Sequence, residues 1–443
     1  MTPSLFQLLL CLALGIAAII LLTAKYRVHA FFALFIACFV VGLGLQFSVP
    51  DILTAMKDGF GNIMKSLGLI IVLGTALGIL LECSGSTRVM AAFILKKIGE
   101  RRAPLAMSVT GFIVGLPIFC DSGYIVLSGL NQSLARRTRI SMVTMAVSLA
   151  TGLYSVHCLI PPHPGATASA ATLGVDYGKL ILMGIIVAIP ASMAGYFWAN
   201  FAGKKLPTVL AAEDTKSHEL SCQPPVVMAF LPVIVPIVLI ALKSFFTMKS
   251  FAATGWQNKL LSAGDPVIAL AIGVLLAFAG GKSWKKNIVG SLLQEAAEKA
   301  GGILVIIGAG GAFGAVLAAA KIGQQFEQTP ALSSLGILFP FLLTSLLKTA
   351  QGSSTVAIIT AASIVQPLLP ALGLSNGKGQ LLCVLAMGAG SMMISHANDA
   401  YFWVIAKFSG LEMKAMLKVY SVASIVMGLV SLLMVYLLSW ILP

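Results

Sequence analysis

The chain has 443 residues, of which 58% are hydrophobic and only 10% are charged, and its mean hydropathy is +0.98. This composition excludes a soluble globular domain and predicts an all-α polytopic membrane protein. The net charge of +14 does not indicate a nucleic-acid partner, because the Lys and Arg residues fall in short clusters between apolar segments and form no continuous basic face.

Apolar segments follow one another along the whole chain, and several are interrupted. In the first half we expect spans at 4–22, 28–47, 66–83, 104–120 with 122–135, 139–158 with 165–174, and 178–202. In the second half we expect spans at 225–245, 264–281, 301–320, 332–349 with 353–371, 380–394 with 399–409, and 416–441. A cytoplasmic linker at 204–224 then separates a first membrane repeat, 1–203, from a second, 225–443.

Loop charges predict the orientation of these spans. The interrupted segments at 104–135 and 332–371 are interpreted as re-entrant hairpins. With these hairpins and an external N-terminus, most of the 29 basic residues fall in cytoplasmic loops, as the positive-inside rule requires. Among these loop residues are Arg101, Arg102, Arg139, Lys204 and Lys299. The same distribution predicts an external C-terminus.

The two halves of the chain share sequence patterns. KSLGLIIVLGTALG at 65–78 matches KAGGILVIIGAGGA at 299–312, with one Lys and two Gly in register. LATGLYSVHCLIPP at 149–162 matches LAMGAGSMMISH at 385–396 once two residues are dropped. Each half then holds five spans and one hairpin, and an odd number of spans places the second copy upside down. The patterns therefore predict an inverted repeat, which is typical of secondary transporters.

Polar breaks interrupt one predicted helix in each half, at 139–174 and at 380–409. The first break, IPPHPGAT, contains three prolines that remove backbone donors and end the helix, and the second, ISHANDAY, offers Asn398 and Asp399 as helix caps. Irregular backbone at membrane depth is tolerated only where it is buried in protein or lines a watery cavity. We therefore expect the breaks and the polar hairpin tips, FCDSGY and TAQGSST, to meet near the midplane. Half-helix N-termini there favour an anion, and freed carbonyls suit a cation.

Four segments together resemble the gluconate permease family: GLPIFCDSGYIVLSGL, HCLIPPHPGATASAATLGVDYGK, KTAQGSSTVAIITA and ISHANDAYFW. The resemblance covers most of the chain. It implies proton-coupled uptake of gluconate or a related small hydroxy or sugar acid across the bacterial inner membrane, with D-serine or glycerate-like substrates in some relatives. It also implies the ion-transporter superfamily of elevator-type carriers, and hence a homodimer. The chain departs from the family pattern at Asp121, Lys348 and Ala400, where members often have Glu, Arg and Pro.

The candidate substrate-binding residues lie at the hairpin tips and the breaks. They are Ser122, Gly123, His163, Lys348, Gly352, Ser353, Ser354, Thr355, His396 and Asn398. Asp121 and Asp399 are assigned to proton coupling, because a carboxylate at membrane depth is functional by default. Asp121 is also expected to cap a helix that begins at Ser122. We expect Lys348 to pair with a substrate carboxylate, although snorkelling to the surface is an alternative.

The sequence predicts a transporter and not an enzyme. Neither H-E-x-x-H, G-x-S-G nor a P-loop occurs, and no metal or cofactor is expected. The predicted partners are the lipid bilayer, a small anionic hydroxy acid and a proton, and the substrate anion should favour protonation of Asp121. Sodium coupling through the unwound backbone at 397–399, a D-serine or glycerate-type permease, and an ion channel are the alternatives.

Overall fold

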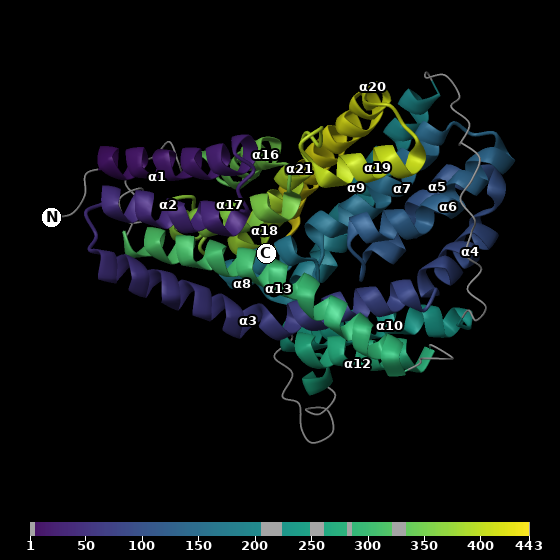
Figure 1. The fold of residues 1–443 in the computed structure, drawn as a ribbon, viewed down its shortest axis with the longest axis horizontal. Coiled ribbons are helices and arrows are strands. Elements are labelled where there is room, and N and C mark those ends of the chain that lie inside the picture. Colours follow the sequence, from purple (N-terminus) through teal and green to yellow (C-terminus); the bar gives the residue numbers. More distant parts are fainter. Residues whose placement is uncertain (1–4, 205–223, 249–260, 281–285, 321–333, 443) are drawn as a thin grey trace.

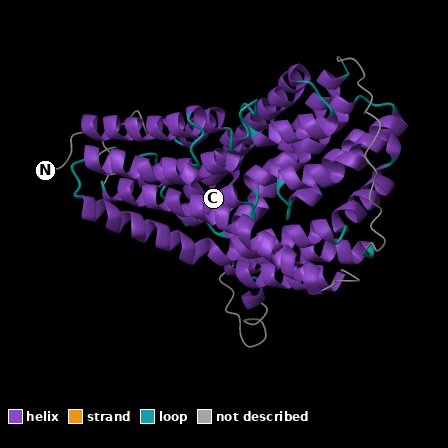
Figure 2. Ribbon diagram, in the orientation of Figure 1, coloured by secondary structure: helices purple, strands orange, loops and turns teal. Residues whose placement is uncertain are grey.

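The computed structural model describes residues 5–204, 224–248, 261–280, 286–320 and 334–442, and within these ranges all regular structure is helical (Figure 2). In the described part of the chain, six helical stretches are long and apolar enough to cross a membrane, one of them, Met142–Leu173, comprising two helices and the break between them. The predicted fold class, an all-α polytopic membrane protein, is confirmed. The predicted linker at 204–224 lies almost wholly outside the described residues.

The helices form two series (Figure 1). The first comprises α1 (Leu5–Ile20), α2 (Ala30–Gly44), α3 (Val49–Cys83), α4 (Ser86–Ile98), the short 3₁₀ helix η2 (Glu100–Arg102), α5 (Ala103–Gly115), α6 (Cys120–Thr138), α7 (Met142–Leu159), α8 (Pro164–Leu173) and α9 (Tyr177–Gly203). The second comprises α10 (Val226–Met248), α12 (Pro266–Gly280), α13 (Lys286–Ala319), α16 (Leu338–Gln351), α17 (Ser354–Val365), α18 (Gly377–Ser391), α19 (Ala400–Ser409), α20 (Met413–Met416) and α21 (Val422–Ile441).

Two helices begin much earlier than the predicted spans at 66–83 and 301–320. Helix α3 has 35 residues and α13 has 34, because amphipathic turns precede the apolar part of each. Ser48 starts α3 by accepting a hydrogen bond from the backbone N–H of Asp51 at 3.3 Å. Helix α4 was not predicted at all. It has only 13 residues, too few to span a membrane, and Lys96 and Lys97 in its last turn are exposed.

Helices α3 and α13 pack along each other (Figure 1). Their contact is close at Gly59, where an added Cβ would collide with the carbonyl oxygen of Gly311. Helix α2 packs against α13, and α12 packs against α3. These contacts join the two series along their length.

The remaining packing partners bring each hairpin to the opposite series. Helix α5 packs against α7, as α16 packs against α18, and α7 packs against α9, as α18 packs against α21. Between the series, α6 packs against α19, and α17 packs against α8. The second arm of each hairpin therefore lies beside the second half of the broken helix from the other series. This exchange places four helix ends around one region, namely the N-terminal ends of α6, α8, α17 and α19.

Candidate functional site

Both predicted helix breaks are present. Helix α7 ends at Leu159 and α8 begins at Pro164, whose missing N–H is no loss in the first turn of a helix. Helix α18 ends at Ser391, and α19 begins after Asp399. The Asp399 carboxylate accepts a hydrogen bond from the backbone N–H of Tyr401 at 3.0 Å, so its predicted capping role is confirmed.

The two hairpin tips differ in how their second helix begins. Ser353 caps α17 by accepting a hydrogen bond from the N–H of Val356 at 3.3 Å. Helix α6 begins at Cys120, so Asp121 lies inside its first turn, and the expectation that Asp121 caps a helix starting at Ser122 is wrong. The N-terminal helix end still favours the Asp121 carboxylate through its dipole.

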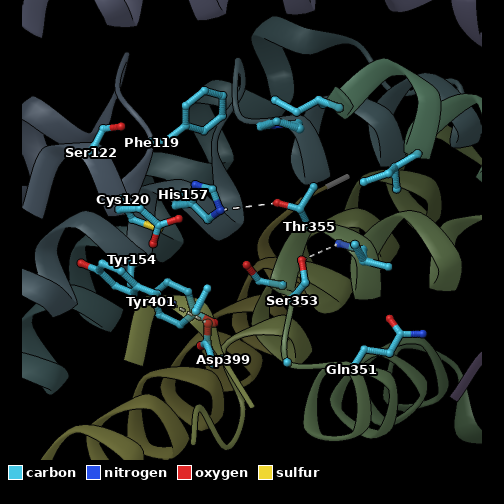
Figure 3. Close-up of a pocket in the computed structure, with 18 of the residues that line it drawn as sticks. Phe119, Cys120, Ser122, Tyr154, His157, Gln351, Ser353, Thr355, Asp399 and Tyr401 are labelled. Atoms are coloured by element: carbon cyan, nitrogen blue, oxygen red, sulfur yellow. Dashed lines mark hydrogen bonds between the residues drawn. The ribbon is translucent and has the colours of Figure 1, made fainter. Parts of the chain in front are cut away.

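The four helix ends enclose a cavity of about 630 Å³, a volume typical of small-molecule sites. In Figure 3 the side chains of Phe119, Cys120 and His157 face Ser353 and Thr355 across the centre of the view. Eight of the predicted site residues line the cavity: Asp121, Ser122, Gly352, Ser353, Ser354, Thr355, Asn398 and Asp399. Four others, Gly123, His163, Lys348 and His396, are not among its lining residues.

Lys348 is fully buried, and its Nζ lies 2.7 Å from Oδ2 of Asp399. The same ammonium donates to the Gly352 carbonyl oxygen at 2.6 Å, and the Ser395 hydroxyl donates to the Asp399 carboxylate. A snorkelling Lys348 is therefore contradicted. A buried ion pair of this kind has each charge compensated by the other, and removing one partner leaves an uncompensated charge.

The second hairpin tip is further tied to its neighbouring break by side chains that bind the last carbonyls of α16. Asn398 donates to the carbonyl oxygen of Thr349 at 2.7 Å and to that of Ala350 at 3.2 Å. Nε2 of His396 lies 3.1 Å from the same Thr349 oxygen. These contacts satisfy acceptors that the helix itself leaves open.

Gly352 ends α16 with a φ of 83°, in the left-handed region that favours glycine. An added Cβ there would also collide with the carbonyl oxygen of Asn398. The hairpin tip and the break thus approach each other at backbone distance.

The first hairpin tip has fewer such links. His163 is buried, and its Nε2 lies 2.6 Å from the Gly115 carbonyl oxygen at the end of α5, so this histidine holds the break against the hairpin. His157, six residues earlier in the last turn of α7, lines the cavity instead. Its Nε2 is 3.5 Å from Oγ1 of Thr355, and its buried Nδ1 has no partner in the described part of the chain. The sequence analysis selected His163 and passed over His157.

Asp121 is half-buried at the cavity wall and forms no ion pair with any described residue. The Cys120 thiol contacts its carboxylate, with the sulfur 3.9 Å from Oδ1. Both polar atoms of the Gln351 side chain, which also lines the cavity, are buried and without a partner among the described residues. Buried polar groups are normally hydrogen-bonded, so these atoms are available to a ligand or to water.

One cationic side chain, that of Lys299, lines the cavity from a position that we expected to lie in a loop. Lys299 was assigned to a cytoplasmic loop, but it lies within α13 and lines the cavity with Ile303 and Ile306. It pairs with Glu295 one turn earlier at 2.7 Å, and 43% of its side chain is exposed.

Aromatic side chains form part of the cavity wall. The rings of Tyr154 and Tyr401 have their centroids 5.6 Å apart, and both residues line the cavity (Figure 3). The Tyr154 hydroxyl donates to the Ser391 carbonyl at 3.0 Å, and the Tyr401 hydroxyl donates to the Ala150 carbonyl at 3.2 Å. Because these hydroxyls are engaged, the rings mainly offer apolar surface. The described residues contain no group of three or more potential metal ligands.

Comparisons with known proteins point to permeases. A family model described as GntP family permease matches residues 7–441. The chain is 33% identical to a gluconate permease of Pseudomonas aeruginosa over 447 residues, which cover 98% of each chain. It is 30% identical to the D-serine transporter DsdX of Escherichia coli, over 97% of this chain and 98% of that one.

Two solved transporters share the fold. The Alcanivorax borkumensis YdaH transporter aligns with a TM-score of 0.55 and 14% identity, over 89% of this chain and 90% of its own. Neisseria gonorrhoeae MtrF, described as one of a class of antimetabolite efflux pumps, aligns with a TM-score of 0.59 and 13% identity, over 87% of this chain and 83% of its own. At these identities the likeness is one of fold alone.

Proposed function

The chain belongs to the GntP permease family, and from this premise we propose that it takes up a small hydroxylated carboxylate, gluconate or a related acid, together with a proton. The family predicted from the sequence motifs is confirmed, and the protein is a membrane transporter and not an enzyme. The gluconate permease and the D-serine transporter among its relatives carry different compounds, but both compounds bear a carboxylate and a hydroxyl group.

The cavity at the meeting point of the four helix ends is the observation that carries this proposal. The N-terminus of α17, with the hydroxyls of Ser354 and Thr355, offers donors for a carboxylate. Lys299 of α13, whose ammonium is also 2.7 Å from Glu295, adds a cationic group to the cavity wall. The unpartnered Gln351 amide can both donate to and accept from the hydroxyls of a sugar acid.

Proton coupling is assigned to Asp121, because it faces the same cavity and forms no ion pair within the described part of the chain. A substrate anion arriving nearby disfavours the ionised carboxylate, so the substrate and the proton help each other to bind. The linkage is reciprocal. Substrate affinity should therefore rise as the pH falls, until Asp121 is already protonated in the substrate-free carrier. Asp399 was also predicted to couple protons, but we now assign it to the fixed ion pair with Lys348.

The two helix series are proposed to be an inverted repeat that alternates access to this cavity. The recurring packing partners and the exchange of α6 and α17 between the series support this proposal. The bacterial origin of the relatives supports the bacterial inner membrane as the location. The homodimer, the elevator movement and the external termini stay predictions.

Uptake by the purified protein in liposomes tests the proposal. Labelled gluconate should accumulate when the interior is alkaline relative to the medium, and uptake should saturate. Unlabelled gluconate, glycerate and D-serine added outside will rank the substrates. Accumulation driven only by a sodium gradient would show that sodium, and not a proton, is the coupling ion. A flux that does not saturate with gluconate concentration would favour the channel alternative.

A further inference from the structure

A second cavity, of about 400 Å³, lies at one end of the first helix series, between η2, the start of α7 and the end of α9. Its lining includes four cationic residues from three segments of the chain: Arg101, Arg102, Arg139 and Lys204. No carboxylate of the described residues lines it. Glu100, next in sequence to Arg101, is instead 2.8 Å from the guanidinium of Arg137. The cavity therefore carries a concentrated positive charge.

The start of α7 adds hydrogen-bond donors to this charge. Ser141 is the N-cap residue, but its side chain makes no cap bond, and its buried Oγ has no partner among the described residues. The first N–H groups of an α-helix have no intrahelical acceptor, and the helix dipole there favours an anion. The C-terminal carbonyls of α9 end at the same cavity, where Lys204 offsets their negative end. The combination suits a phosphate group.

An apolar stripe on α9 leads to this cavity. Its members are spaced three or four residues apart, which places them on one helix face, and they are 42–60% exposed: Ile186, Ile189, Met193, Phe197 and Phe201. Tyr196 and Asn200, each next in sequence to a stripe residue, line the cavity. A ligand with its phosphate in the cavity could thus lay a hydrocarbon chain along the stripe.

We propose that this cavity binds the phosphate of an anionic phospholipid, with an acyl chain lying along the α9 stripe. The four cations supply the attraction to the headgroup, and the stripe supplies contact with the chain. A free phosphate would use only the first of these features. The loop-charge rule accounts for cations on this side of a membrane protein, but it does not require them to surround a cavity with unpartnered donors.

Native mass spectrometry of the purified full-length protein can measure lipid binding directly. We expect phosphatidylglycerol to bind more tightly than phosphatidylcholine of the same acyl length. The triple substitution Arg101→Gln, Arg139→Gln, Lys204→Gln should weaken phosphatidylglycerol binding roughly 100-fold, on the scale of about 1 kcal/mol for each basic residue near an anionic headgroup. The control, Lys96→Gln with Lys414→Gln and Lys418→Gln, removes the same charge from exposed residues outside the cavity and should change binding less than about threefold.

Three results would overturn the proposal. An equal loss in both triple variants would show a diffuse attraction between surface charge and lipid. Full competition by glycerol phosphate, which has no acyl chain, would show a site for soluble phosphates. If Phe197→Ser separates a dimer and leaves lipid binding unchanged, the stripe is a subunit interface. A thermal unfolding midpoint measured without lipid verifies that each variant is folded.

Discussion

The two hairpin tips differ in how their charges are used. The tip between α16 and α17 is tied to its neighbouring break by the Lys348–Asp399 ion pair and by the bonds from Asn398 and His396 to the last carbonyls of α16. At the tip between α5 and α6, His163 makes a single hydrogen bond of this kind, to Gly115. Asp121 there faces the cavity and has no ion-pair partner among the described residues. A fixed charge pair stabilises a structure, whereas an unpaired group can change its charge when a ligand arrives.

This difference assigns separate roles to the two tips. Under the proposed function, the second tip is a scaffold whose charges are neutralised within the protein and change little during transport. The first tip then holds Asp121, the carboxylate proposed to respond to the substrate. The predictions below test this division from the largest expected effect to the smallest.

Breaking the scaffold should have the largest effect. Lys348→Met leaves Asp399 as an uncompensated buried charge and should lower the free energy of unfolding by about 3–5 kcal/mol. Thermal or denaturant unfolding in detergent measures the change. The double variant Lys348→Met with Asp399→Asn carries no buried charge and keeps a capping oxygen, so it should recover a large part of this loss. If the single variant is as stable as the wild type, the ion pair is not the scaffold.

Removing the cavity cation should weaken substrate binding and leave stability nearly unchanged. Lys299→Gln loses one charge-assisted contact with the substrate carboxylate, which corresponds to a dissociation constant roughly 10- to 100-fold higher. Lys65→Gln is the matched control, because Lys65 holds the equivalent repeat position on α3, is exposed and does not line the cavity. Calorimetry with purified protein measures both variants. If Lys299→Gln binds the substrate as tightly as Lys65→Gln does, Lys299 does not contact the substrate carboxylate.

The smallest effect is expected at the cap of α17. Ser353→Ala removes the side-chain bond to the Val356 N–H and should cost about 1 kcal/mol of stability. Ser353→Asn keeps a capping oxygen and should unfold like the wild type. The tip at α6 has no side-chain cap of this kind, since its N-cap residue is Phe119. If Ser353→Asn is as unstable as Ser353→Ala, the cap bond does not hold this tip.

The sequence predicted the breaks and the hairpins because their signals are local. The three clustered prolines of the first break disrupt the helix within a few residues, and Ser or Asp caps a helix through a bond to a nearby N–H. Single prolines are less informative, since Pro190 lies inside α9 and Pro232 inside α10. The ion pair of Lys348 was missed, because its partner lies 51 residues away and only the packing of the two elements brings them together. Lys348 was therefore assigned to the substrate.

Which residues face the cavity was harder to predict. Every residue of α7 is buried, so its hydrophobic pattern does not distinguish the face with His157 from the others. Lys299 was misplaced for a different reason. The loop-charge rule counts basic residues near span ends, and it does not register that α13 continues as a helix through this position.

Proton-driven accumulation by the Asp121→Asn variant is the most direct test of the division between the two tips. The Asn side chain mimics the protonated carboxylate, so the variant should exchange substrate across liposomes and bind it with little dependence on pH. It should fail to concentrate substrate when only a pH gradient is imposed, whereas Asp51→Asn, at an exposed carboxylate in the first turn of α3, should concentrate it like the wild type. If Asp121→Asn still accumulates substrate under that gradient, the proton travels by another route and the account is contradicted.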